Sequence, residues 1–257
     1  MGKRQPTPDD PGSDPEKPCA LCLRHLKLCN SHIVPESCYR PAYDSRHCAS
    51  ELRSWDTRWR PIQVGKRERL LCEECDTKRI GRYDTYFKGF WFDRPALPPV
   101  ISGRTVDVTG ADYTLLKLFH LSVLWRAGVS SQAGFSNVKL GPYGEKLRAM
   151  LLRGDPGPED AYPIWGTVIL MDDRSVAYEL VCSPLGSRLE SFTVYCMCYA
   201  GCEWNFLVND HVTGPYLMFC LKKNAPLQLA ARSWKDINSL RGRFSSPLPR
   251  KPRTPFQ

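Results

Sequence analysis

The sequence has little that would place it in a membrane or export it from the cell. Residues 1–18 contain no apolar stretch, so we expect no secretory signal peptide. The most apolar run, 113–129, is interrupted by Lys117, His120 and Arg126 and is shorter than the roughly 20 residues that span a bilayer. We therefore expect a cytoplasmic protein with no membrane partner, in which cysteines stay reduced.

The sequence also lacks an acidic balance and, in its second half, a catalytic pattern. Residues 104–257 hold no grouping of nucleophile and base that would indicate an enzyme, and no internal repeat. Lys and Arg number 36 against 27 Asp and Glu, which gives a net charge of +9. A basic excess of this size favours an anionic partner, with nucleic acid first.

Composition divides the chain into segments. Residues 1–17 are rich in Pro, Gly and Asp and predict a disordered lead-in. Residues 18–94 are rich in Cys, Arg and Trp but poor in long apolar runs, so this module needs a metal to fold. A Pro-rich linker, 95–103, precedes a domain of unknown function at 104–240 that has apolar runs for its own core. The basic, Pro-rich tail 241–257 closes the chain.

The pattern of residues 104–240 predicts two helices and an antiparallel sheet, an α+β fold. The first helix begins at Thr109, its N-cap, and ends at Gly128; the second covers 145–152. The expected strands are 164–171 and 176–182, joined by a hairpin turn at Asp172–Arg174, followed by 192–199 and 216–221.

Four cysteines in two C-x-x-C pairs carry the strongest motif: Cys19 with Cys22, and Cys72 with Cys75. Two intervening residues let both thiolates of a pair reach one tetrahedral ion, and two pairs complete a closed site of the structural type. We therefore expect one structural Zn²⁺.

The other cysteines lack metal-ligand spacing. Cys29, Cys38 and Cys48 are interpreted as buried or free thiols, and the group at 196–202 as core packing. Of the histidines, His25 and His47 are expected at the surface and His120 in the core.

Between the pairs lies Ser31-His32-Ile33-Val34-Pro35, and the second pair opens a helix after Leu71. This order of knuckle, histidine segment and Leu-Cys-x-x-Cys resembles the HNH endonucleases, ββα-metal nucleases built on a treble-clef zinc finger. The resemblance covers about residues 19–88. It implies an N-terminal treble-clef module and cleavage of phosphodiester bonds by a histidine base and a divalent metal, with bacterial defence as a fitting setting.

The resemblance implies roles for particular residues. His32 stands at the general base. Ser31 occupies the place of a metal-binding Asp or His, Asp76 that of the final His ligand, and Arg67 lies near the Asn that orients the base. A carboxylate at Asp76 suits Mg²⁺ or Mn²⁺, and Glu36 is the better candidate than Asp84 for a second ligand, since Asp84 lies roughly 12 Å along the helix from Asp76. The catalytic set is thus His32, Asp76 and Glu36.

Basic residues surround these motifs. Arg67, Lys78, Arg79 and Arg82 are expected to bind phosphates, and Trp55 and Trp59 lie among further arginines. The sequence predicts a metal-dependent nucleic-acid endonuclease, acting on DNA first. Because Ser31 and Arg67 depart from the family pattern, the alternative is a non-catalytic zinc module that binds nucleic acid or a partner protein. For His32 itself, the alternative is a residue that packs against the zinc knuckle or ligates the zinc.

Overall fold

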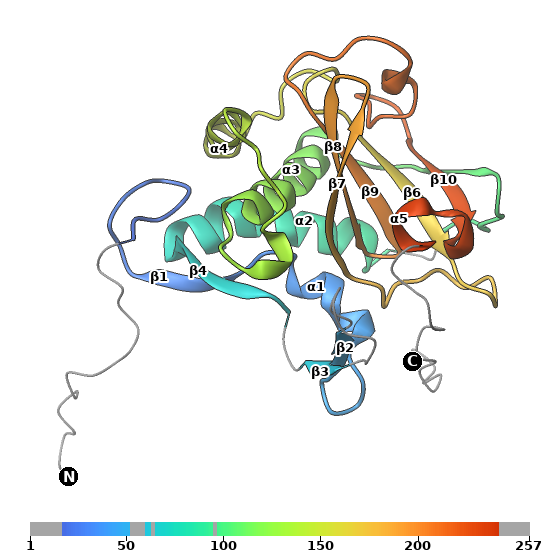
Figure 1. Ribbon diagram of the computed structural model, residues 1–257, viewed down its shortest axis with the longest axis horizontal. Coiled ribbons are helices and arrows are strands. Elements are labelled where there is room, and N and C mark those ends of the chain that lie inside the picture. The colour runs from blue at the N-terminus through green and yellow to red at the C-terminus, as the bar shows by residue number, and fades with distance from the viewer. Residues whose placement is uncertain (1–16, 52–59, 63–64, 95–96, 242–257) are drawn as a thin grey trace.

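The computed structural model describes residues 17–51, 60–62, 65–94 and 97–241, and it has an α+β fold (Figure 1). The predictions for residues 1–16, Trp55, Trp59 and 242–257 therefore concern residues outside the described part of the chain. The elements of the first part, in chain order, are β1 (Leu28–His32), α1 (Glu36–Tyr39), η1 (Arg40–Ala42), β2 (Ala49–Glu51), β3 (Arg60–Ile62), β4 (Arg67–Cys72), η2 (Glu74–Ile80) and α2 (Gly81–Trp91).

The second part contains the longest helix and the main sheet. Its elements are β5 (Thr105–Val108), α3 (Tyr113–Val129), η3 (Ala133–Phe135), α4 (Tyr143–Arg153), β6 (Ile164–Leu170), β7 (Cys182–Leu189), β8 (Phe192–Tyr199), β9 (Cys202–Val208), η4 (Pro215–Met218), β10 (Leu227–Ser233), η5 (Trp234–Asp236) and α5 (Asn238–Arg241).

The main sheet has six strands in the order β5-β10-β6-β9-β8-β7. All its pairings are antiparallel except that of β10 with β6, which is parallel. The expected antiparallel sheet is therefore a mixed sheet. After β6 the chain forms β7, β8 and β9 on one side of β6, and it then passes to the other side to form β10. A connection of that length can place β10 parallel to β6, which a tight hairpin could not.

Several expected boundaries are wrong. Asp112, not Thr109, caps α3, because its carboxylate accepts a hydrogen bond from the Leu115 amide at 2.9 Å. Residues 172–174 do turn, but only the single bridge Leu170–Val176 forms there, and the strand that follows is β7. Residues 215–218 form a 3₁₀ turn instead of a strand.

Helices α2 and α3 pack side by side and carry one hydrophobic core across both parts of the chain (Figure 1). The rings of Phe87 and Phe119 stack with centroids 3.8 Å apart. The Trp91 indole donates a hydrogen bond of 2.9 Å to the Ala200 carbonyl, beyond the end of β8. The zinc module and the α+β part therefore share a core, contrary to the expectation of a separate one.

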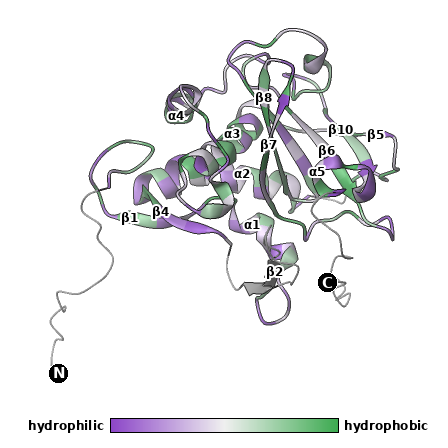
Figure 2. Ribbon diagram, viewed as in Figure 1, coloured by the Kyte–Doolittle hydropathy of each residue, from purple (hydrophilic) through white to green (hydrophobic). Residues whose placement is uncertain are grey.

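Helix α3 is apolar on nearly every face, and the structure buries most of its side chains, as such a helix requires. No helix in the described part of the chain is both long and apolar enough to cross a membrane. Figure 2 shows β4 as largely hydrophilic where it begins, and this end of the strand lies beside the candidate site.

Candidate functional site

The four predicted cysteines come together at one point. Their sulfur atoms all lie within 4.8 Å of one another, and the sulfurs of Cys22 and Cys72 are 3.8 Å apart. Metal–sulfur bonds of about 2.3 Å in tetrahedral geometry place sulfurs about 3.8 Å apart. The cluster therefore fits a tetrahedral zinc ion, and the pairing of the two C-x-x-C motifs is confirmed.

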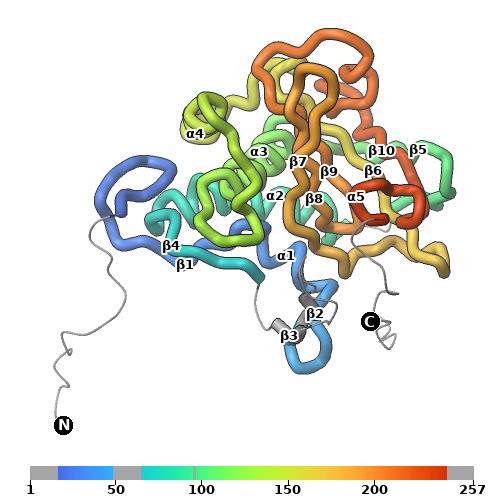
Figure 3. Tube along the Cα trace, in the orientation of Figure 1, coloured from blue at the N-terminus to red at the C-terminus, as the bar shows by residue number. Residues whose placement is uncertain are grey.

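Local backbone geometry produces this cluster. The first pair sits on a tight turn in which the Leu23 amide donates to the Cys19 carbonyl at 2.8 Å, and Leu23 itself adopts a left-handed φ of 61°. The Cys72 amide donates to the Cys19 sulfur at 3.3 Å, which ties the end of β4 to the knuckle. The tube in Figure 3 places this knuckle near α4, where Arg148 donates to the Leu21 carbonyl.

The strand pair that ends at the four cysteines also carries His32. Strands β1 and β4 pair antiparallel, with His32 opposite Arg67. Ser31 lies on the other face, as alternation in a strand requires; its side chain is 1% exposed and donates to the Cys29 carbonyl at 3.4 Å. The position that holds a metal ligand in the HNH pattern therefore points away from the site.

His32 lies in a small cluster of charged side chains. Its Nε2 is 2.6 Å from Oε2 of Glu36, which the start of α1 brings back toward the strand. Arg67 places Nε 2.7 Å from the same Nε2 and Nη2 3.4 Å from Glu36. The side chains of His32, Glu36 and Arg67 are 19%, 25% and 33% exposed, so solvent reaches all three.

The Nε2 atom of His32 thus faces both a hydrogen-bond acceptor, the Glu36 carboxylate, and a donor, the Arg67 N–H. A protonated Nε2 donates to Glu36 but opposes the Arg67 N–H, whereas a bare Nε2 accepts from Arg67 but opposes the carboxylate. Burial and then the charge of Arg67 lower the pKa of His32. Burial works against ionisation of Glu36, but His32, Tyr43 and Arg67 outweigh it and lower the pKa of that carboxyl. Such a site is suited to moving a proton.

His47 is exposed, as the sequence predicts, and it also belongs to this group. Its Nε2 lies 3.7 Å from Oε1 of Glu36, and its ring packs on Tyr43 with centroids 4.0 Å apart. Tyr43 in turn hydrogen-bonds Glu36. The ten residues between Glu36 and His47 contain no motif that would reveal the contact, because it depends on the turn at Asp44.

Arg126, on α3, contacts the backbone of His32 and the side chain of Asp84. Its side chain is 2% exposed and binds Asp84 through two hydrogen bonds of 2.9 and 3.0 Å. It also donates to the His32 carbonyl at 3.0 Å. Burial raises the pKa of Asp84, and Arg126 opposes this. Asp84 is therefore a partner of α3 rather than a free ligand.

Asp76 does not join His32. Within the described residues it makes no hydrogen bond or ion pair with His32 or Glu36, and the four cysteines are the one group of three or more potential metal ligands. Asp76 instead lies in the first turn of η2, a π-helix, where its carbonyl accepts from the Gly81 amide. Of the expected catalytic set, Glu36 contacts His32, whereas Asp76 makes no such contact.

Two of the expected phosphate-binding residues make contacts inside the protein. Arg79 donates to the Leu152 carbonyl at 3.2 Å and pairs with Glu74. Arg82 donates to the Tyr83 hydroxyl at 3.0 Å. Lys78 is exposed and has no polar partner among the described residues, so it remains the best placed of the three for phosphate.

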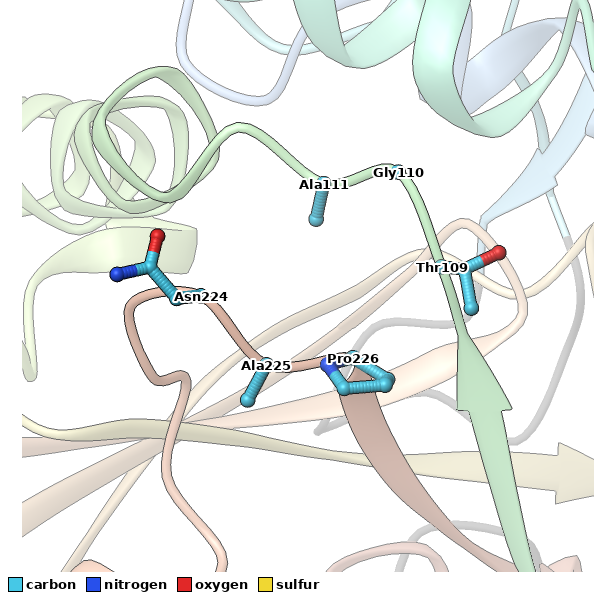
Figure 4. A pocket seen from close by; sticks show the side chains of 6 residues that line it. All are labelled: Thr109, Gly110, Ala111, Asn224, Ala225 and Pro226. Atoms are coloured by element: carbon cyan, nitrogen blue, oxygen red, sulfur yellow. The ribbon is translucent and has the colours of Figure 1, made fainter.

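A surface pocket lies elsewhere, between Thr109–Ala111 and Asn224–Pro226 (Figure 4). No ionisable side chain lines it, so it offers no acid, base or nucleophile. Comparisons with models of protein families, with curated proteins and with solved structures give no match.

Proposed function

We propose that this protein is a nucleic-acid endonuclease of divergent HNH type that cleaves phosphodiester bonds at His32. The observation that carries the proposal is the contact of His32 with Glu36 and Arg67, at one end of the β1–β4 strand pair, whose other end lies at the four cysteines. Knuckle, hairpin and helix follow one another in the treble-clef order. Zn²⁺ at the cysteines has the structural role, since four protein ligands close the site.

His32 acts as the base in this proposal. When Nε2 carries the ring proton and donates it to Glu36, the other ring nitrogen, Nδ1, is bare and can take a proton from the attacking oxygen. Nδ1 has no hydrogen-bond partner among the described residues. A lowered pKa keeps the imidazole neutral near pH 7 and able to accept that proton. Glu36 is thereby reassigned from metal ligand to the group that orients the base, and Arg67 supplies positive charge for a phosphate.

A catalytic Mg²⁺ or Mn²⁺ does not fit the carboxylates that surround His32. Glu36 is occupied by His32 and Arg67, Asp84 by Arg126, and Asp76 stands apart. A hard cation prefers several free oxygen ligands, and Ser31 is turned away. We therefore derive no step through such an ion.

The burial of Ser31 favours a second candidate, a zinc-stabilised module that binds nucleic acid without cleaving it. In that case His32 and Glu36 would only stabilise the hairpin. The net charge of +9 and the exposed Lys78 would favour nucleic-acid binding by a nuclease and by a non-cleaving module alike. DNA remains the first partner to test for binding.

A nuclease assay separates the two candidates. Wild-type protein should cut single- or double-stranded substrates, and His32→Ala should lower the rate by about 10²–10⁴-fold, the usual contribution of a general base. His25→Ala is the matched control, because His25 is exposed and outside the cluster, and it should keep full activity. Zinc content and nucleic-acid affinity should be equal in all three proteins. Binding without cleavage by the wild type would establish the second candidate.

A further inference from the structure

We propose that His32, Glu36, His47 and Arg67 (the His32 cluster) cleave RNA without a divalent metal, using the 2′-hydroxyl of the substrate as the nucleophile. This inference rests on the proposed nuclease function and assigns its substrate class and chemistry. It begins from the donor set around His32, in which a guanidinium, and not a set of free carboxylates, faces the reacting groups.

Arg67 supplies the positive charge that a metal ion would otherwise provide beside the phosphate. Its Nε and Nη2 lie beside His32 and Glu36 at 2.7 and 3.4 Å, and its side chain is one-third exposed. The N–H groups of the guanidinium that do not face His32 and Glu36 can donate to a phosphate oxygen, and its positive charge can stabilise the negative charge that builds up on the phosphoryl oxygens during attack.

His47 adds a second imidazole on the far oxygen of the same carboxylate. Glu36 faces His32 through Oε2 and His47 through Oε1. His47 is held in place, because its amide donates to the Asp44 carbonyl at 2.9 Å and its ring packs on Tyr43. The Asp44 side chain closes the same turn by accepting from the amides of Arg46 and Cys48. The cluster therefore offers one imidazole as base and a second, 62% exposed, as acid.

Among the described residues, the carboxylates around His32 are engaged by other side chains, Glu36 by His32 and Arg67 and Asp84 by Arg126, and this decides the nucleophile. An ordinary water is hard to activate without a metal, whereas a 2′-hydroxyl is already held beside the phosphorus and gains the advantage of an intramolecular reaction. Among nucleic acids only RNA carries this hydroxyl. The cluster, with a base, an acid and a guanidinium, has the groups that this reaction requires.

The 2′-hydroxyl gives its proton to Nδ1 of His32, and the oxygen forms a bond to phosphorus. The bond from phosphorus to the 5′-oxygen breaks, and that oxygen takes a proton from the His47 imidazolium. The products are a 2′,3′-cyclic phosphate and a free 5′-hydroxyl, and solvent exchange resets both imidazoles.

The test compares an RNA oligonucleotide with the DNA of the same sequence and with an RNA that carries a single 2′-deoxyribose at the cut site. The protein is first passed over chelating resin, and its zinc content is checked to be unchanged. We expect cleavage of RNA without added divalent ions, cyclic-phosphate ends by mass spectrometry, and no cleavage at the deoxyribose.

His47→Asn should slow RNA cleavage by about 10²-fold or more. Asparagine suits this position, because His47 has a left-handed φ of 59°, which Asn adopts readily. His25→Asn is the matched control and should not differ from the wild type. Addition of imidazole to the variant His47→Gly should restore part of the rate, which a purely structural role of His47 would not allow.

The outcomes separate the two proposals. Cleavage of DNA, or of RNA at the deoxyribose, only with added Mg²⁺ or Mn²⁺ would overturn this inference and leave the nuclease function in place. Full activity of His47→Asn on RNA would also overturn it. No cleavage of any of the three substrates, with or without metal, would overturn the nuclease function together with the inference.

Discussion

Arg126 offers the sharpest test of how the site is held together. Its guanidinium joins three elements, since it binds Asp84 on α2, its own helix α3 through Ser122, and the His32 carbonyl at the end of β1. The change Arg126→Met removes these bonds with little loss of volume. Asp84 then keeps a half-buried carboxylate with no cation beside it.

The expected cost follows from this geometry. Breaking a buried ion pair by removal of one partner costs about 3–5 kcal/mol. The Asp84 side chain is 25% exposed, so water relieves part of the cost and we expect about 3 kcal/mol. For a chain of this size, that lowers Tm by roughly 6–12 °C.

The pH dependence gives the second half of the prediction. Burial raises the pKa of Asp84, and Arg126 lowers it in part. Without Arg126 the folded-state pKa rises further above the unfolded value, and the carboxyl destabilises the folded state only while it is ionised. The deficit of Arg126→Met relative to wild type should therefore shrink as the pH falls from about 7 toward 5.

The assay is urea unfolding followed by far-UV circular dichroism at both pH values. Asp84→Asn in the Arg126→Met background is the matched control, because a neutral amide cannot leave an unpaired charge in the protein interior. This double variant should recover about 1 kcal/mol or more relative to Arg126→Met at pH 7. A cost below about 1 kcal/mol, or a deficit that does not change with pH, would refute the reasoning.

Three further predictions concern zinc, acid stability and binding. Purified protein should contain one equivalent of zinc by elemental analysis. Cys72→Ser should lower the unfolding midpoint of the whole chain in a single transition, because one core joins both parts. An α+β part that unfolds separately would contradict this prediction. Burial lowers the pKa of His120 to about 3 from 6.5, so stability should fall by up to about 1.4 kcal/mol per pH unit below pH 6.5, and His120→Gln should flatten this slope in acid titrations. Nucleic-acid affinity should drop by orders of magnitude between about 50 and 200 mM salt; Lys78→Glu should weaken it for all sequences alike, and an unchanged affinity would remove Lys78 from the interface.

The sequence was most informative where the chemistry is local. The spacing of two C-x-x-C pairs was enough to predict their common cluster, because two intervening residues fix how a pair of thiolates can point. Alternating apolar residues located β8 at 192–199 without error. The run of apolar residues around Leu116–Leu124 identified α3 as a buried helix, since a helix that is apolar all round must be covered on every side.

Contacts between distant segments were beyond the sequence. Gly128 was expected to end α3, yet the helix continues to Val129, and a Cβ at Gly128 would lie 2.3 Å from Leu140. Its small size makes room for a neighbour that is 12 residues away. Asp76 and Glu36 were both expected beside His32, and in the tertiary structure only Glu36 contacts it.

The sequence by itself therefore determined the zinc cluster, the α+β class and His32 as a candidate. Only the tertiary structure decided which groups surround that histidine. His47 reaches Glu36 through the turn at Asp44, and Arg126 reaches the His32 carbonyl from a helix 94 residues away. Such contacts depend on how whole elements pack, and packing is set by the combined volume and polarity of many side chains rather than by the spacing of a few.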